Sequence, residues 1–429
     1  MERVVTSTVH CDLEGKITFL SEGAQEIFQY TNEELIGKER VSVFSPGLVV
    51  LGHVPTWLKK SVSDGHFETD TVFVRKDGSQ FAAHIRLTPI VKDGEHTGYI
   101  GLTTPLPDKS VEETMPPVSL VTKILSWLYT TRSPFLTAAI VPVLLGAVLV
   151  AGDMNVGMLL LTILGVSLAH LGVNTANDYF DWKSGADQAN LDYVIPFSGG
   201  SRMIQLGVIS PQGMLRTSLV LFALGAIVGA YIASTQDIWS EVITLALAGA
   251  AIGFFYTSPP IRLAARGLGE IGIMVAFGPL IVAGAALVQL GSGANGLDLW
   301  LGIPTTFLWA GIPTGLLTAA IVWVNEFPDI KGDAASNKNT LVVRLGLQKS
   351  CWAYFVLMLL TYGSLFLLVN AGHLPTGAYL GLITIPFALY VTRQIFKNYE
   401  SRSIKDAMAG TIGLHFLTGV LMVVGVSIF

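Results

Sequence analysis

The segment VGMLLLTILGVSLAHLGVNTANDYFDWKSGAD (residues 156–187) begins as an apolar stretch and ends in a cluster of amides and carboxylates. Its apolar part is close to the ~20 residues that a helix needs to cross a bilayer. A charged side chain within the bilayer costs about 2.5–3.5 kcal/mol on insertion scales, so such placements are usually functional. The segment therefore predicts a membrane helix with a functional site at one end.

The composition indicates one soluble part and one embedded part. The 429 residues are 51% hydrophobic and only 13% charged, which is typical of a membrane protein. Of the 57 Lys, Arg, Asp and Glu residues, 28 lie in the first 120. The N-terminus has no apolar core of a secretory signal and is expected to stay in the cytoplasm. Cys11 and Cys351 offer neither a disulfide framework nor metal-ligand spacing, and no basic run indicates a nucleic-acid partner.

An all-α, multi-pass membrane domain of nine transmembrane helices is expected from residue 121 onward. The nine apolar spans are 134–151, 156–174, 214–233, 240–257, 270–290, 299–324, 352–370, 377–392 and 407–428. The loops after even-numbered spans contain Lys and Arg, whereas the loops after odd-numbered spans contain none. By the positive-inside rule, the N-terminus and the even loops face the cytoplasm of a cell (inner) membrane and the C-terminus lies outside.

Two polar sets lie at the cytoplasmic ends of their spans. The first set is Asn174, Asn177, Asp178, Asp181 and, after a turn at Gly185, Asp187. On an ideal helix its first four members fall within an arc of about 100°, so they can point into one cavity. The second set is Asn325, Asp329 and Asp333, at helical spacings of four residues. Carboxylates without His or Cys suit Mg²⁺, which binds one or two carboxylates together with waters and substrate phosphates.

Groups that bind phosphate occur in the cytoplasmic loops and just before the first span. They are Arg132, Arg202, Tyr256, Arg262, Lys331 and Lys338. Guanidinium groups make bidentate contacts to phosphate oxygens, so a diphosphate between the two acidic sets is expected.

The same parts predict a reaction. Asp178, Asp181, Asp329 and Asp333 are the expected catalytic residues, because a metal that they hold stabilises diphosphate as it departs. The departing group leaves a carbocation, which an allylic isoprenoid chain forms readily. An electron-rich acceptor can then attack it.

Three segments resemble the signature segments of the UbiA-type intramembrane prenyltransferase family: NDYFDWKSGAD, YTSPPIRLAARGLGE and NEFPDIKGDAASNKNTLVVRLG. The likeness covers residues 121–429 and is greatest to the branch that prenylates 1,4-dihydroxy-2-naphthoate on the way to menaquinone. It implies Mg²⁺-dependent transfer of a polyprenyl group from polyprenyl diphosphate to an aromatic acceptor. In that family the acidic motifs hold Mg²⁺ and the diphosphate, which carries over to Asn177, Asp178, Asp181, Asp187, Asn325, Asp329 and Asp333. The Tyr and basic residue after the fourth span carry over to Tyr256 and Arg262.

Residues 1–105 alternate short strands with short helices and resemble a PAS sensor domain. Strands are expected at 4–12, 16–20, 66–75, 79–91 and 97–106, with helices at 21–30 and 31–38. Asp77-Gly78 and Asp93-Gly94 are strong hairpin signals. A proline-containing linker, residues 106–120, leads to the membrane domain. Ligand sensing and a dimer through the PAS-like domain are both open.

The residues leave other functions open. Prenyl transfer to 4-hydroxybenzoate, to a chlorophyll or haem precursor or to a glycerol lipid uses the same motifs. A PAS-linked, cation-binding membrane sensor or transporter is an alternative of another class. It requires polar residues and broken helices near the bilayer midplane, whereas this chain keeps its acids at one face.

Overall fold

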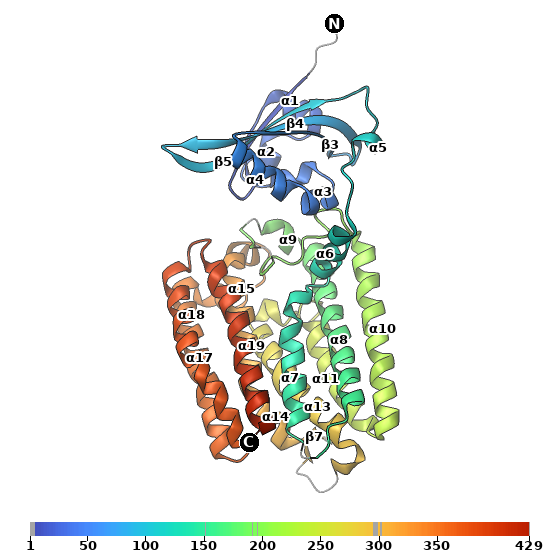
Figure 1. The fold of residues 1–429 in the computed structure, drawn as a ribbon, viewed down its shortest axis with the longest axis vertical. Coiled ribbons are helices and arrows are strands. Elements are labelled where there is room, and N and C mark those ends of the chain that lie inside the picture. Colours follow the sequence, from blue (N-terminus) through green and yellow to red (C-terminus); the bar gives the residue numbers. More distant parts are fainter. Residues whose placement is uncertain are drawn as a thin grey trace. The chain divides into compact units, whose positions relative to one another are not determined.

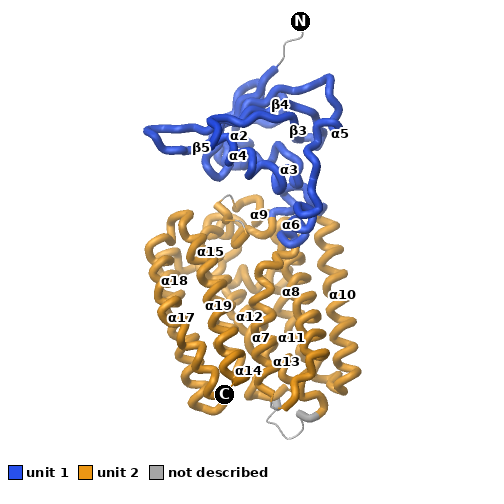
Figure 2. The backbone as a smooth tube through the Cα atoms, viewed as in Figure 1, with its two compact units in different colours: residues 1–130, 202–210 blue, residues 131–201, 211–429 orange. Residues whose placement is uncertain are grey.

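The structure is a computed structural model of the chain. It describes residues 5–150, 152–190, 192–194, 196–294, 299–300 and 303–428. Residues 4, 151, 301 and 302, which belong to predicted strands and spans, lie outside the described residues. The chain forms two compact units (Figure 2). Unit 1 is Met1–Thr130 with Arg202–Ser210, and unit 2 is Thr131–Ser201 with Pro211–Phe429.

Unit 1 contains a five-stranded antiparallel sheet in the order β2-β1-β5-β4-β3. The strands are β1 (Ser7–Asp12), β2 (Ile17–Leu20), β3 (Phe67–Val74), β4 (Gln80–Lys92) and β5 (Glu95–Pro105). Lys92 pairs with Glu95, so Asp93 and Gly94 form a two-residue hairpin. All five predicted strands are therefore present, with ends within two residues of the prediction except at the start of β1, which begins three residues later than predicted.

Helices pack against this sheet and enclose an aromatic core. They are α1 (Glu22–Phe28), α2 (Asn32–Leu35), the 3₁₀ helix η1 (Val41–Phe44), α3 (Gly47–Gly52), α4 (Val54–Asp64) and α5 (Val111–Thr114). The core includes Phe28, whose ring stacks on Phe44 at 4.1 Å between centroids. Helix α6 (Leu120–Thr130) ends the unit's first segment.

Unit 2 is a bundle of long helices (Figure 1). The helices before the second acidic motif are η2 (Ser133–Leu136), α7 (Thr137–Val148), α8 (Val156–Ser184), α9 (Ala186–Ala189), α10 (Pro211–Gln236), α11 (Trp239–Phe255), η3 (Ala264–Arg266), α12 (Gly269–Val275), the π-helical turn η4 (Ala276–Leu280), α13 (Ile281–Leu290) and η5 (Gly291–Ala294). A short pair, β6 (Leu299–Trp300) and β7 (Ile303–Pro304), precedes α14 (Thr305–Ala310) and α15 (Ile312–Ala335). The remaining helices are α16 (Leu341–Leu345), α17 (Leu347–Asn370), η6 (Thr376–Thr384), α18 (Ile385–Asn398) and α19 (Ile404–Ile428).

Helices occupy all nine predicted spans, but the count of nine transmembrane helices is not confirmed. Among the described residues, seven helical segments are long and apolar enough to cross a membrane, or eight if a bent pair that includes α7 is one span. Two helices account for the difference. α7 is 12 residues long with Pro142 inside it, and α11 has only 17 residues.

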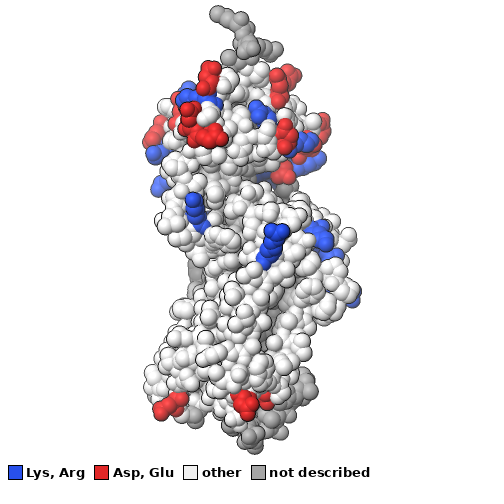
Figure 3. Space-filling view, turned by 90° about the vertical axis from the view of Figure 1, so that its right-hand side faces the viewer, with Lys and Arg blue, Asp and Glu red and all other residues white. Residues whose placement is uncertain are grey.

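Helix α15 lies at the centre of the bundle. In the segment Thr305–Ala335, 78% of the most apolar 18-residue stretch is buried, whereas the corresponding share is 17–39% in the other six segments. It packs against α12, α17 and α19. On the face drawn in Figure 3, the described helices of unit 2 show a broad belt without charged side chains, and the few charges at the far end of the bundle are acidic.

Candidate active site

The first acidic motif lies on the last three turns of α8 and on α9. Asn174, Asn177 and Asp181 line a cavity of unit 2 with an empty volume of about 1060 Å³, part of it open to solvent. The helix ends at Gly185, and α9 then returns Asp187 to the same cavity. Four of the five predicted members, Asn174, Asn177, Asp181 and Asp187, therefore line one cavity, whereas Asp178, which was also expected to point into it, does not.

Asp178 lies behind the cavity wall and holds the loop that follows α9. Its Oδ2 accepts a hydrogen bond from the backbone N–H of Ser201 at 3.1 Å. A Cβ at Gly200 would lie 3.0 Å from Asp178 Oδ1, so the backbone approaches this carboxylate closely. Asp178 is 2% exposed and is not among the lining residues.

The second motif lies on α15 and faces the same cavity. Asn325, Asp329 and Asp333 all line it, and α15 continues through Pro328 without a break. Asp329 accepts hydrogen bonds from Asn190 Nδ2 at 2.6 Å and from the Gly199 N–H at 2.9 Å. The Gly199 amide is thus bound to a carboxylate in this structure.

Lys338 connects the two motifs. Its Nζ lies 3.5 Å from Asp181 Oδ2 and 3.6 Å from Asp333 Oδ1. Burial by itself would lower the pKa of this ammonium, but the facing carboxylates of Asp181 and Asp333 outweigh burial and raise the pKa well above its ordinary value. Lys338 is therefore a fixed positive charge between the acidic motifs.

The other expected phosphate ligands divide into two groups. Arg132 and Tyr256 line the cavity, whereas Arg202, Arg262 and Lys331 are not among its lining residues. Arg202 belongs to unit 1, where burial raises the pKa of the Glu39 carboxyl and the Arg202 guanidinium opposes that rise.

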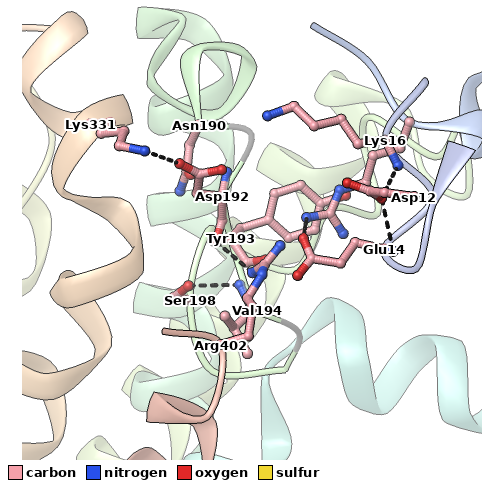
Figure 4. Close-up of polar contacts among 11 residues, drawn as sticks. Asp12, Glu14, Lys16, Asn190, Asp192, Tyr193, Val194, Ser198, Lys331 and Arg402 are labelled. Carbon is pink, nitrogen blue, oxygen red and sulfur yellow. Dashed lines mark hydrogen bonds and ion pairs between the residues drawn. The ribbon is translucent and has the colours of Figure 1, made fainter. Parts of the chain in front are cut away.

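Lys331 is exposed and pairs with Asp192 in the loop after α9 (Figure 4), with 3.0 Å between Nζ and Oδ2. Arg402 donates to the carbonyls of Asp192 at 2.7 Å and Tyr193 at 2.8 Å. These contacts fasten the loop between the two motifs. Residue spacing did not predict this role for Arg402, because the loop after α9 has no helical or strand periodicity.

The inner part of the cavity is apolar. Its walls are Phe135, Ala138, Val173, Ile273, Phe277, Ile321 and Val322. His170 also lines it, packs edge-on against Phe277 at 4.9 Å between centroids and leaves its Nδ1 without a hydrogen-bond partner. Trp323 and Phe327, aromatic residues next to the second motif, are instead buried in the core.

The comparisons with known proteins agree with this geometry. Residues 139–419 match the UbiA prenyltransferase family, and residues 5–104 match a PAS domain. The chain is 28% identical over 310 residues to 2-carboxy-1,4-naphthoquinone phytyltransferase of Synechocystis sp., covering 70% of this chain and 92% of that protein. It is 25% identical over 300 residues to 1,4-dihydroxy-2-naphthoate octaprenyltransferase of Bacillus subtilis, covering 70% of this chain and 91% of that one.

A solved structure has the same fold as unit 2. It is a UbiA homolog from Archaeoglobus fulgidus bound to GPP and Mg²⁺, with a TM-score of 0.50 and 15% identity, covering 70% of this chain and 99% of that one. The family match spans well over half of the chain. The protein therefore belongs to the UbiA prenyltransferase family, is a prenyltransferase, and carries a PAS domain ahead of its membrane helices.

Proposed function

We propose that the protein transfers a polyprenyl group from polyprenyl diphosphate to an aromatic acceptor, with Mg²⁺ as cofactor. One observation carries the proposal: both acidic motifs and a long apolar wall belong to a single cavity. The polar end suits a metal-bound diphosphate, and the apolar part suits an isoprenoid chain.

The donor set fits Mg²⁺. Asn177 Oδ1, Asp178 Oδ1 and Asn325 Oδ1 are buried and have no hydrogen-bond partner, which is costly unless a ligand satisfies them. Among the described residues, no three His, Cys, Asp or Glu side chains gather tightly enough to form a metal site alone. Mg²⁺ usually takes one or two carboxylates plus waters and substrate phosphates. Asn177, Asp178, Asp181, Asp187, Asn325, Asp329 and Asp333 are the residues proposed to hold it, and the bound metal would neutralise charge on the leaving diphosphate.

Positively charged and hydroxyl groups complete the diphosphate site. Lys338 and Arg132 supply positive charge inside the cavity, and Tyr256 supplies a hydroxyl. Charge-assisted hydrogen bonds of this kind are about twice as strong as neutral ones. Arg202, Arg262 and Lys331 do not line the cavity, and Lys331 lies on α15 with its ammonium paired to Asp192, so none of the three is assigned to the diphosphate here.

A naphthoate-type quinone precursor such as 1,4-dihydroxy-2-naphthoate is the proposed acceptor. The support is the pair of relatives whose names specify a naphthoquinone and a naphthoate substrate. The apolar wall with Phe135 and Phe277 offers faces on which a fused ring can stack.

We further propose nine spans in a cell membrane, with the cavity and the N-terminus on the cytoplasmic side. α11, at 17 residues, is about 25 Å long at 1.5 Å per residue and would span a locally thinned region of the bilayer. The distribution of Lys and Arg among the loops supports the orientation.

The reaction is tested with the purified full-length protein in lipid nanodiscs. Radiolabelled geranylgeranyl diphosphate and 1,4-dihydroxy-2-naphthoate should give a lipid-soluble labelled product only with Mg²⁺. Asp181→Asn and Asp329→Asn should each lower the rate at least about 100-fold, because each removes a charge that interacts with the metal or the diphosphate. Asp406→Asn, at an exposed position of α19, is the matched control. Wild-type rates in both cavity variants would refute the assignment.

Regulation by the PAS domain is part of the proposal. Ser201 binds the catalytic Asp178, and the next nine residues, Arg202–Ser210, belong to unit 1. The chain thus runs directly from the acidic motif into the unit that contains the PAS domain. Within that unit a Cβ at Gly47 would lie 2.3 Å from the carbonyl oxygen of Leu206, so α3 packs closely on this segment. Cys11 is buried, and burial followed by the charge of Asp12 raises its thiol pKa to about 11, which does not favour thiolate chemistry as the signal.

A further inference from the structure

One carboxylate of the cavity has no place in the metal or diphosphate site. Glu326 lies on α15, lines the cavity and is 8% exposed. Its Oε2 is buried and has no hydrogen-bond partner. A buried carboxyl oxygen without a partner is costly, and the cavity that Glu326 lines has room for a ligand that satisfies it.

Helix geometry places Glu326 at the inner limit of the polar part. It lies seven residues before Asp333, which is two turns, so the two side chains share one stripe and are separated by about 10 Å along the axis. Asp329 is about 4.5 Å away along the same axis. On the next turn inward, α15 contributes Ile321 and Val322 to the apolar wall. Glu326 therefore stands at the boundary between the diphosphate end and the isoprenoid end.

The charged neighbours of Glu326 are Glu270, Asp333 and Lys338, and Thr340 is a hydrogen-bonding neighbour. The ion pairs of Lys338 go to Asp181 and Asp333. Tyr256 lines the same cavity and offers a hydroxyl group. The partnerless Oε2 of Glu326 is a buried acceptor at this point, and a neutral hydroxyl donor can satisfy it.

We propose that Glu326 binds the aromatic acceptor, with Oε2 accepting a hydrogen bond from a ring hydroxyl. This inference rests on the prenyl transfer proposed above and adds a specific acceptor contact to it. The bond would hold the acceptor ring at the boundary where the prenyl chain parts from its diphosphate. The ligand class is a hydroxylated aromatic, and the selectivity expected is for a free hydroxyl over its methyl ether.

The test separates donor binding from acceptor binding in the full-length protein. Glu326→Met removes both oxygens at nearly constant length, and Glu326→Gln keeps one hydrogen-bond acceptor. Asp406→Asn, at an exposed position of α19 that does not line the cavity, is the control variant. Each variant is assayed for Mg²⁺-dependent binding of radiolabelled geranylgeranyl diphosphate and for transfer over a range of 1,4-dihydroxy-2-naphthoate concentrations.

Glu326→Met should bind the donor diphosphate as wild type does, while kcat/KM for the acceptor falls at least about ten-fold, the equivalent of about 1.4 kcal/mol. Glu326→Gln should recover part of that loss, and Asp406→Asn should show none. The wild type should prefer the free hydroxyl to the monomethyl ether, and Glu326→Met should not. An unchanged acceptor kcat/KM in Glu326→Met would overturn the inference, as would an equal loss of donor binding. A wild type that binds no prenyl diphosphate would overturn this inference and the proposed reaction together, whereas normal donor binding with a normal acceptor response in Glu326→Met would overturn the inference alone.

Discussion

At the scale of single residues, the backbone at Gly200 lies so close to the first acidic motif that an added side chain would crowd two of its carboxylates. The φ of Gly200 is +73°, and an added Cβ would lie 3.0 Å from Asp178 Oδ1 and 3.4 Å from Asp187 Oδ1. Gly200→Ala should therefore displace two proposed metal ligands and lower the transfer rate about ten-fold or more, since small misplacements of catalytic groups cost up to about 10²-fold.

The control for that variant is Gly185→Ala. Gly185 has a similar φ of +81° but no atom within 4 Å of the added Cβ. Both substitutions carry the backbone cost of a left-handed residue, about 1–2 kcal/mol. Steady-state transfer and thermal unfolding are measured for both. Equal losses of transfer would mean that backbone strain, and not contact with the carboxylates, explains the effect.

Lys338 gives a second prediction at this scale. Lys338→Met leaves the carboxylates of Asp181 and Asp333 buried without the ammonium that lies 3.5–3.6 Å from them. Removing one partner of a buried pair typically costs about 3–5 kcal/mol, so the melting temperature in EDTA should fall clearly. Added Mg²⁺ should restore more stability to this variant than to the wild type, because the metal replaces the missing positive charge.

Lys331→Met is the matched stability control for Lys338→Met. The Lys331 side chain is 83% exposed, and exposed ion pairs contribute about 0–1 kcal/mol. Differential scanning fluorimetry in EDTA and in Mg²⁺ compares the two variants. An equal, small effect in both would show that Lys338 does not neutralise the acidic motifs.

At the scale of elements, helical periodicity made the site predictable and loops did not. Asn177, Asp181, Asp329 and Asp333 recur at spacings of four residues, so the sequence alone placed each pair on one helix face. The sequence analysis did not select Glu326, although helical spacing also places it on this face, seven residues before Asp333. It follows Asn325 directly, so a search for spacings of four residues from Asn325 passed over it. A search for all acids within one arc of α15 would have found it.

The loop after α9 follows no such rule. Arg202 and Lys331 were expected at the phosphate because they are cations close to the motifs in sequence. Arg202 belongs to unit 1, and Lys331 pairs with Asp192 on the outside. Contacts such as those of Arg402 with the carbonyls of Asp192 and Tyr193 join residues about 210 positions apart. No local pattern encodes them.

At the scale of the whole molecule, the PAS domain and the membrane domain were both predictable from composition and motifs, whereas the membership of residues 202–210 in unit 1 was not. That segment comes from between α9 and α10, yet it clusters with the PAS-containing unit. The order of the elements along the sequence does not predict that residues 202–210 group with unit 1. In the proposed regulation, this segment is the covalent route by which a change in unit 1 would reach Asp178.

Gly47→Ala tests that route. The added methyl group would meet the Leu206 carbonyl oxygen at 2.3 Å, so the segment must move. We expect a changed transfer rate, about two-fold or more, with an unchanged cavity sequence, in line with coupling energies of about 0.5–2 kcal/mol. Gly101→Ala is the control, because its nearest contact is an ordinary 3.7 Å to Leu87. Identical kinetics in both variants and the wild type would remove the coupling proposal.

The central claim is that one cavity, built from two acidic helix ends, binds a magnesium-bound prenyl diphosphate. Equilibrium binding of radiolabelled geranylgeranyl diphosphate to the full-length protein in nanodiscs, with Mg²⁺ and with EDTA, tests it most directly. We predict saturable binding with Mg²⁺ that EDTA, Asp181→Asn or Asp329→Asn abolishes and that Asp406→Asn preserves. Binding that persists in EDTA and in both cavity variants, or no binding by the wild type, would contradict it.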